Sequence, residues 1–538
     1  MTAYSILLQD QGKRGRFFGS VLFFTLLSIA IIVSGQSYLG TVDDPYLMDF
    51  LSHGENRTLI MSYPLSTVVA WLYQTFPDVQ WLSWIYFLYL EAAILLYSGY
   101  IANIEERTVR RLMLGTGAVV LLFSLMNITI TLLTLLLIVL AMPLVKRDQI
   151  AFWCVVLAAS LLRDTIVVSV LPLLAVAYLF FFDRSYFTKR RIAAVSLLVL
   201  LTVLNILSPK MDKEYQSWLD FYHARVYFTD LHGVDERGVM NEAENLIAKS
   251  WFPQDEALLP TEKIIEAAGS EFDVILYRLT HMKLRMIASR LYHHKVLFLL
   301  LFLTGYLLFK QERSWYKRGV YLLFVIGFFT LFFIRDVDRV TYPLIFLWMA
   351  LLTKDFLAFK SYRELKILYA GAIVAFLIDL PLYNREHRAP DWKYRDELVS
   401  LMEKHDLRYE PALGFPMTVS GEMVAAMSQN RLFAEKTWIS NYIIPAGWMS
   451  RHPYYYRSHN ISGYGIKRAY DDYHDYLLHG KAAFIGSKTA NPKMTKSVLA
   501  MYDKIFGCCH RVVTVDESDH FRIVRVEKVA SPISHRAF

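Results

Sequence analysis

Apolar runs separated by short polar segments fill the part of the chain from 1 to 384. Each run approaches the length of about 20 residues with which a helix crosses a hydrocarbon core. The stretch 112–144 is too long for one crossing at about 1.5 Å per residue, so we place a hairpin at Met126 and Asn127. We expect about eleven membrane-spanning helices, at 17–37, 82–103, 112–126, 128–145, 150–164, 166–183, 192–208, 294–310, 319–335, 341–359 and 366–384.

Polar regions at 38–81 and 209–293 interrupt these runs. In 38–81, Asp44 and Pro45 are residues that favour the start of a helix. That helix has one apolar stripe, formed by Leu47, Phe50 and Leu51. A second helix is predicted at 64–76, ended by Pro77, and we expect both helices to lie at the membrane interface.

A third polar region, 385–538, follows the last apolar run. It begins with an amphipathic helix pattern at 394–405. Strand patterns at 481–485, 512–515 and 521–526 then alternate with helix patterns at 466–478 and 493–506. The expected fold is an α-helical polytopic membrane domain, 1–384, followed by a small α/β domain, 385–538.

The chain has a net charge of +8, and its Lys and Arg residues are concentrated in short segments between apolar runs. These segments fall on alternate loops, at 13–16, 105–111, 146–148, 183–191, 310–318 and 354–366. The positive-inside rule assigns such loops to the cytoplasm. We therefore predict a cytoplasmic N-terminus, with 38–81, 209–293 and 385–538 extracytoplasmic. No basic face is large enough to follow nucleic-acid phosphates, so nucleic acid is not an expected partner.

Charged residues mark the outer ends of several predicted spans, where ionisable groups are costly and therefore indicate function. They are Asp43 and Asp44 after the first span, Arg163 and Asp164 between the fifth and sixth, and Arg335, Asp336, Asp338 and Arg339 between the ninth and tenth. Carboxylates suit acid–base chemistry and arginines suit phosphate oxygens, which are the groups that a lipid phosphate requires. The structural alternatives are a helix cap at Asp44 and ion pairs that stabilise tight outer turns.

The segment DDPYLMDFLSHG followed by SYPLSTVVAWLYQTFPDVQW resembles the first outer loop of GT-C membrane glycosyltransferases. The shared order is an acidic pair directly after the first span, an interfacial helix and a Pro-Leu segment. This resemblance implies an inverting enzyme that uses a polyprenyl-phosphate sugar donor and a glycan, lipid or protein acceptor at the outer face.

The same resemblance implies roles for the charged residues. Asp43 or Asp44 would be the general base, and the donor phosphate would be held by Arg163, Arg335 or Arg339. Asp164 and Asp336 would be second acidic residues or ligands of a divalent cation, Mg or Mn.

The chain also resembles a group of uncharacterised bacterial multi-pass membrane proteins. They share the Asp-Asp loop, an element that runs here from Arg225 to Asp230, and a segment similar to NYIIPAGWMSRHPYYY. This likeness implies a location in the bacterial plasma (inner) membrane and adds Arg225 and Asp230 as outer-loop contributors to the site.

Two other functions explain part of the pattern. A transporter or flippase of a lipid-linked intermediate would account for the spans, but not for the region 385–538, and it would favour inverted repeats, which are not evident. A non-catalytic subunit of cell-surface polysaccharide assembly would use 385–538 to bind a partner. In that case the pair Asp43 and Asp44 would be dispensable.

Overall fold

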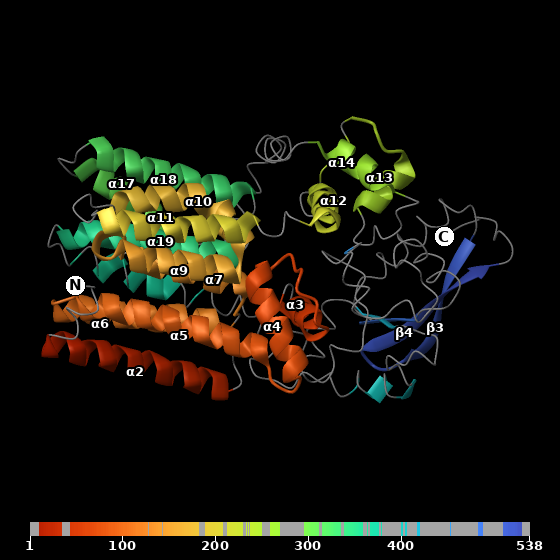
Figure 1. The fold of residues 1–538 in the computed structure, drawn as a ribbon, viewed down its shortest axis with the longest axis horizontal. Coiled ribbons are helices and arrows are strands. Elements are labelled where there is room, and N and C mark those ends of the chain that lie inside the picture. The colour runs from red at the N-terminus through yellow and green to blue at the C-terminus, as the bar shows by residue number, and fades with distance from the viewer. Residues whose placement is uncertain are drawn as a thin grey trace.

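A computed structural model gives the fold of the chain (Figure 1). The residues that it describes are 10–34, 44–126, 128–142, 144–181, 189–207, 212–229, 233, 235, 237–249, 259–269, 295–310, 315–334, 338–358, 363, 366–368, 370–375, 378, 397, 400–401, 404–405, 417–419, 452, 483–487 and 509–529. Of the sequence predictions, Asp43, Asp230, Arg335, Asp336 and the helices at 466–478 and 493–506 lie outside them.

A bundle of apolar helices forms the larger part of the described structure. Its helices are α2 (Gln11–Val33), α5 (Trp81–Ala102), α6 (Arg107–Met126), α7 (Ile130–Ala141), α8 (Leu144–Arg147), α9 (Gln149–Leu162), α10 (Asp164–Phe181), α11 (Lys189–Leu207), α17 (Val296–Lys310), α18 (Trp315–Ile334) and α19 (Asp338–Ala358). A helix thus lies at each of the first ten predicted spans, and 366–375 is helical where it is described.

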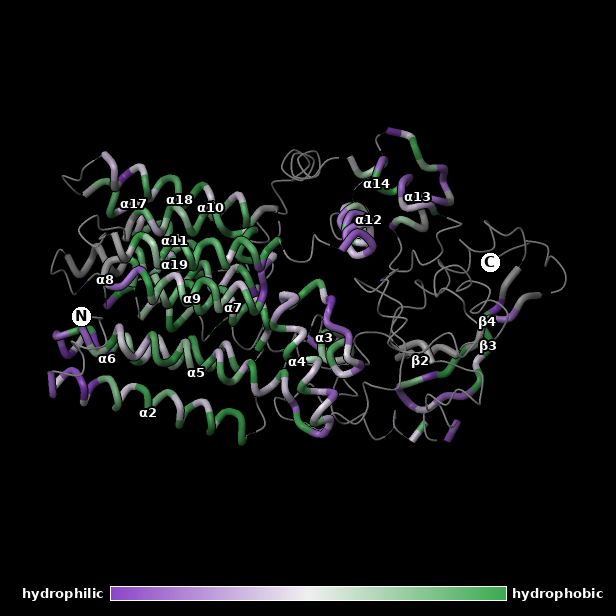
Figure 2. The backbone as a smooth tube through the Cα atoms, viewed as in Figure 1, coloured by the Kyte–Doolittle hydropathy of each residue, from purple (hydrophilic) through white to green (hydrophobic). Residues whose placement is uncertain are grey.

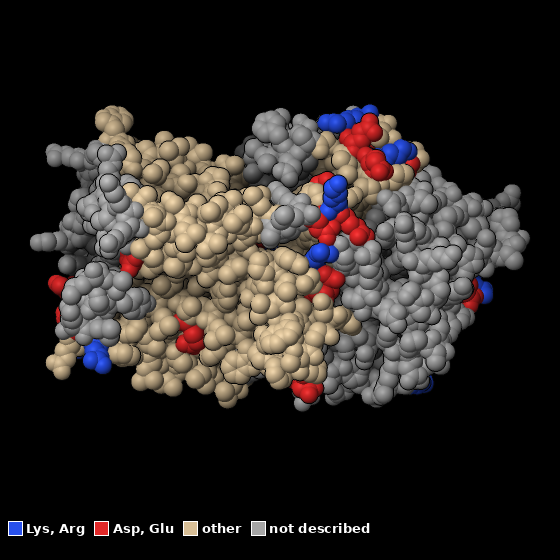
Figure 3. Space-filling model, in the orientation of Figure 1, with Lys and Arg blue, Asp and Glu red and all other residues tan. Residues whose placement is uncertain are grey.

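Three of these helices, α2, α5 and α6, are long and apolar enough to cross a membrane. Figure 2 shows that the bundle is hydrophobic along its length, whereas the opposite part of the molecule is more polar. On the face drawn in Figure 3, few charged side chains interrupt the surface of the bundle. The protein is therefore a mostly helical membrane protein, while a total of eleven spans stays a prediction.

Helix α7 is the centre of the bundle and packs against α5, α9, α10 and α19. All but one of its side chains are buried, and none is exposed. The helix has only 12 residues, fewer than the roughly 20 that cross a hydrocarbon core. The predicted span 128–145 is thus interrupted after Ala141, and α8 begins only at Leu144. The predicted break between 126 and 130 is confirmed, because α6 ends at Met126.

All of the predicted outer regions contribute to one end of the molecule, beyond the end of the bundle opposite the start of α2 (Figure 1). They include α3 (Asp44–Ser52), α4 (Tyr63–Thr75), α12 (Lys213–Thr229), α13 (Glu242–Lys249) and α14 (Thr261–Ala268). Helix α12 packs against α13 and α14, and an ion pair of 2.6 Å between Lys263 Nζ and Glu244 Oε1 joins the latter two. We call this group of five helices the outer layer.

The apolar stripe of α3 does not face the membrane interface, contrary to our expectation. Leu47, Phe50 and Leu51 are completely buried, because other parts of the protein cover this side of the helix. Helix α4 differs, since Ser66, Val69, Ala70 and Tyr73 are buried while Val68 and Trp71 remain exposed. An amphipathic pattern alone does not distinguish a lipid surface from a protein surface.

The C-terminal region contains a four-stranded sheet in the order β1-β2-β4-β3. Its strands are β1 (Met417–Val419), β2 (Ala483–Ser487), β3 (Cys509–Glu517) and β4 (Phe521–Val529); β1 pairs parallel with β2, and the other pairs are antiparallel. Strands β2, β3 and β4 confirm the three predicted strands, and β1 was not predicted. Two helical residues that precede β1 are tied to this sheet, because Glu397 binds His520 and Lys404 binds Asp516 at 2.7 Å.

Candidate functional site

The first turn of α7 is the point at which two of the predicted site residues meet. Thr129 caps this helix, because its side chain accepts a hydrogen bond of 3.1 Å from the backbone N–H of Leu132. The other N–H groups of a first helical turn have no partner within the helix and carry partial positive charge, so they attract acceptors and anions. The sequence ITITLL thus creates a polar end on an otherwise apolar helix.

Asp44 supplies such an acceptor. It begins α3, and its side chain is completely buried. Its Oδ1 accepts a hydrogen bond of 3.2 Å from the backbone N–H of Ile130 and another from the hydroxyl of Tyr86 on α5. The carboxylate therefore joins α3, α5 and α7. The sequence-based alternative made Asp44 a cap of its own helix, whereas these hydrogen bonds place its carboxylate at the start of α7.

Arg163 reaches the same turn from another loop. It follows the last residue of α9, and its Nη1 donates a hydrogen bond of 2.6 Å to Oγ1 of Thr131. Asp44 and Arg163 thus bind consecutive residues of α7, Ile130 and Thr131. We call Asp44, Tyr86, Ile130, Thr131 and Arg163 the α7 junction.

Two other predicted residues belong to the same end of the bundle. Asp164 begins α10 and is buried, with its Oδ1 accepting a hydrogen bond of 2.6 Å from the N–H of Thr165. Arg339 is the second residue of α19, which packs along α7. One turn later, the ring of Tyr342 lies 4.5 Å from that of Phe123 near the end of α6, so Arg339 stands at the end of the bundle where α7 begins.

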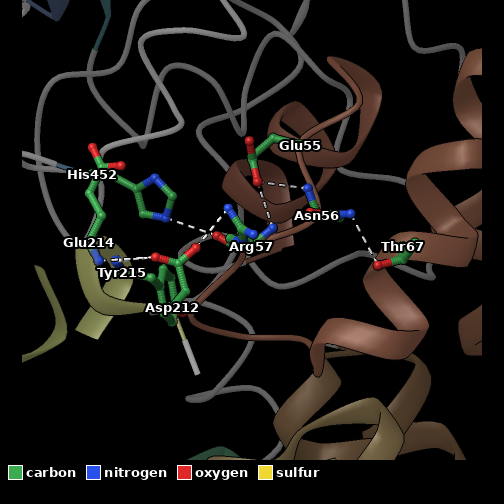
Figure 4. A network of polar contacts seen from close by, with 8 residues as sticks. All are labelled: Glu55, Asn56, Arg57, Thr67, Asp212, Glu214, Tyr215 and His452. Carbon is green, nitrogen blue, oxygen red and sulfur yellow. Dashed lines mark hydrogen bonds and ion pairs between the residues drawn. The ribbon is translucent and has the colours of Figure 1, made fainter. Parts of the chain in front are cut away.

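A polar network covers this end of the bundle (Figure 4). Arg57, in the loop after α3, makes an ion pair of 2.8 Å with Asp212, which precedes α12. Asp212 also accepts hydrogen bonds from the backbone N–H groups of Glu214 and Tyr215, and so caps α12. Glu55 accepts from the N–H groups of Asn56 and Arg57. These contacts fasten the loop 38–81 to the loop 209–293.

Tyr215 adds a second contact between the two loops. Its hydroxyl donates a hydrogen bond of 3.0 Å to the carbonyl oxygen of Thr58. Burial raises the pKa of Tyr215 well above 10, and the nearby carboxylates of Asp164 and Glu55 raise it further. Tyr215 is therefore a neutral hydrogen-bond donor, and Asp164 belongs with the residues beneath α12.

The C-terminal region reaches the same network through His452, which is completely buried. Its Nε2 lies 2.8 Å from the carbonyl oxygen of Arg57. Burial lowers the pKa of His452 to about 3, although its hydrogen bond to Arg57 acts in the opposite direction. The imidazole is therefore neutral at physiological pH.

Arg225 lies on α12, and its guanidinium is buried in the outer layer, 5.7 Å from the centre of the Tyr222 ring. This placement supports a role for Arg225 in the packing of α12. Among the described residues, no three His, Cys, Asp or Glu side chains lie together as ligands for a metal ion.

The sequence did not single out Tyr86, Thr131, Arg57 or His452. Tyr86 lies within an apolar run and Thr131 follows a predicted turn, so neither has a distinguishing pattern. His452 lies in NYIIPAGWMSRHPYYY, one of the segments that carry the resemblance to the bacterial proteins, and this membership is the sequence feature that could have identified it.

Neither a protein family model, a curated protein nor a solved structure matches this chain significantly.

Proposed function

We propose that the protein is a GT-C-type membrane glycosyltransferase, which transfers a sugar from a polyprenyl-phosphate donor to a glycan, lipid or protein acceptor at the outer face of a bacterial inner membrane. The observation that carries this proposal is the convergence of Asp44 and Arg163 on the first turn of α7. A carboxylate loop and an arginine at one membrane boundary are the groups that transfer from a lipid phosphate requires.

The contacts of Asp44 divide the acidic pair into two roles. The Oδ1 of Asp44 already accepts hydrogen bonds from Tyr86 and Ile130 beneath a complete protein cover, so Asp44 holds the start of α3 against the bundle. Asp43, the preceding residue, is then the proposed general base. Arg163 is half-buried and is the proposed partner of the donor phosphate.

The proposed reaction is a single displacement. The carboxylate of Asp43 takes the proton of the acceptor hydroxyl while the hydroxyl oxygen forms a bond to the anomeric carbon. The bond between that carbon and the phosphate oxygen breaks, and the polyprenyl phosphate leaves with the electron pair. The guanidinium of Arg163 stabilises the charge that develops on the phosphate. Attack opposite to the leaving group inverts the anomeric configuration.

The proposal predicts different effects for substitutions within the acidic pair. Asp43→Asn removes the base, and turnover falls by a factor on the order of 100 or more, the usual contribution of a general base. Asp44→Asn weakens the hydrogen bonds that join α3 to Tyr86 and Ile130, and so lowers both turnover and thermal stability. The surface glycans of cells with and without the protein are first compared, to choose the acceptor. Sugar transfer to that acceptor is then measured in proteoliposomes with a panel of polyprenyl-phosphate hexoses and pentoses.

Asp78→Asn is the matched control, because Asp78 is an exposed carboxylate in the same loop. It should retain the turnover of the wild-type protein. Full activity of both Asp43→Asn and Asp44→Asn would exclude the catalytic assignment and favour the non-catalytic subunit.

A further inference from the structure

The side chain of His452 lies between the loops 38–81 and 209–293, both of which are far from it in sequence. It is completely buried and lies 395 positions from Arg57, to whose carbonyl oxygen it is bonded. A carbonyl oxygen can only accept a hydrogen bond, so Nε2 of the imidazole must carry a proton and donate it. The neutral imidazole satisfies this requirement with one proton on Nε2.

Aromatic rings enclose the imidazole. The ring of Trp218 lies 4.4 Å from its centre, that of Phe50 lies 4.8 Å away and that of Tyr215 lies 5.9 Å away, all in steeply inclined edge-type arrangements. Phe50 belongs to α3, whereas Trp218 and Tyr215 belong to α12. One side chain therefore contacts a helix of each outer loop.

The contacts around His452 depend on one another. Arg57 binds His452 through its backbone and Asp212 through its side chain (Figure 4). The neighbouring Thr58 accepts a hydrogen bond from the hydroxyl of Tyr215. Withdrawing the imidazole would expose Phe50 and Trp218 and would leave a buried carbonyl oxygen without this donor. Both changes cost free energy, because apolar surface enters water and a polar group loses its partner.

We propose that His452 is an acid-released latch, which holds the region 385–538 onto α3 and α12 while its imidazole is neutral and releases it when the imidazole is protonated. The latch requires no particular reaction at the α7 junction, so it stands or falls independently of sugar transfer. It gives the C-terminal region two states relative to the outer loops.

The sign of the pH effect follows from the two states of the histidine. In the closed state burial lowers the pKa of His452 to about 3, whereas an exposed histidine has a pKa of about 6.5. Between these values only the open state binds the additional proton, so acid favours opening. From pH 7.5 to pH 5.0 the ratio of open to closed protein should rise roughly 30-fold.

Other titratable and charged groups lie on the elements that face His452. In the described part of these elements they are Asp44, Tyr46, Asp49, His53, Glu55, Arg57, Asp212, Lys213, Glu214, Tyr215, Asp220, Tyr222, His223, Arg225 and Tyr227. The experiment stays at pH 5 or above, clear of the range near pH 4 in which exposed peptide carboxyl groups titrate. Asp164, a buried carboxyl group that acts on Tyr215, is kept in all variants. His53 and His223 are kept in all variants, so their contribution is common to every arm.

Hydrogen–deuterium exchange of the full-length protein in nanodiscs tests the latch. Peptides covering 55–62 and 213–229 are followed at pH 7.5 and 5.0, with rates corrected for the intrinsic effect of pH on exchange. In the wild-type protein the corrected exchange should increase roughly 30-fold at the lower pH. His452→Gln retains an N–H donor but does not titrate, so its exchange should be nearly the same at both pH values.

The matched control is His520→Gln, because His520 also lies in the C-terminal region and binds a carboxylate, Glu397, but is only partly buried. It should respond to pH as the wild-type protein does. His452→Ala should exchange rapidly at both pH values. The latch is refuted if wild-type exchange is the same at pH 7.5 and 5.0, an observation that needs no variant, or if His452→Gln responds as strongly as the wild-type protein.

Discussion

At the scale of single residues, Asp44 shows how a charged group is held at a membrane boundary. Burying a carboxylate costs several kcal/mol unless hydrogen bonds and opposite charge compensate for the lost water. Tyr86 supplies one donor, and the N–H of Ile130 supplies another together with the positive end of α7. The buried carboxylate is therefore part of the packing of the bundle as well as of the proposed site.

Tyr86→Phe should destabilise the protein by about 1.5–3 kcal/mol, the range for a hydrogen bond to a charged group. The matched control is Tyr97→Phe, since the Tyr97 hydroxyl donates a hydrogen bond of 2.9 Å to the uncharged carbonyl oxygen of Met113. Its cost should be about 0.5–1.5 kcal/mol. Reversible unfolding in mixed micelles compares the two variants, and equal losses would contradict the role given to Tyr86.

At the scale of elements, close packing joins α2, α5 and α6, the three described helices that are long and apolar enough to cross a membrane. Gly117 on α6 faces Tyr97 of α5 and Phe24 of α2, whose rings are 5.8 Å apart. A Cβ at this position would lie 2.3 Å from Cε1 of Tyr97 and 2.7 Å from Cζ of Phe24. Small residues permit such approaches between membrane helices, where lipid provides no hydrophobic driving force for association.

Gly117→Ala should therefore lower the stability of the bundle by about 1–3 kcal/mol through overpacking. Gly115→Ala, on the same helix, is the control, because its Cβ would meet only Cδ1 of Ile373 at an ordinary 3.9 Å. Alanine is a better helix former than glycine by up to about 1 kcal/mol, so this variant should be neutral or slightly stabilising. Thermal unfolding in detergent measures both, and a stable Gly117→Ala protein would show that the helices are less tightly packed.

At the scale of the whole molecule, the outer layer and the C-terminal sheet lie beyond one end of the bundle, and α2 begins at the other (Figure 1). That 38–81, 209–293 and 385–538 share one side of the membrane stays a prediction. The side that faces the cytoplasm is predicted only by the basic loops.

Cysteine labelling tests both statements in a background in which Cys154, Cys508 and Cys509 are replaced by serine. Ser217→Cys on α12 and Arg511→Cys on β3 should react with a membrane-impermeant maleimide in intact spheroplasts. Gly15→Cys on α2 should react only after permeabilisation. If positions 217 and 511 were labelled from opposite sides of the membrane, the outer layer and the C-terminal sheet would not share one side. If the labelling pattern of all three positions were reversed, only the prediction of a cytoplasmic N-terminus would be wrong.

The sequence by itself determined the elements of this protein. Apolar runs predicted the bundle helices, Met126 and Asn127 marked a break, and residue alternation predicted β2, β3 and β4, because each signal is contained within one segment. Strand β1, with three residues, was too short to give such a signal. The acidic pair and Arg163 were recognised as candidates because charge at a membrane boundary is costly wherever it occurs.

Only the tertiary structure decided which of these elements meet. Asp44 and Ile130 are 86 positions apart, and His452 and Arg57 are 395 apart. Such pairs depend on how several helices pack together, and no single segment contains that information. The stripe of α3 shows the same limit, since its apolar residues required burial but did not specify whether lipid or protein would cover them. Packing against protein buries this stripe, with Asp44 of the same helix bonded to α7 and Phe50 in contact with the ring of His452.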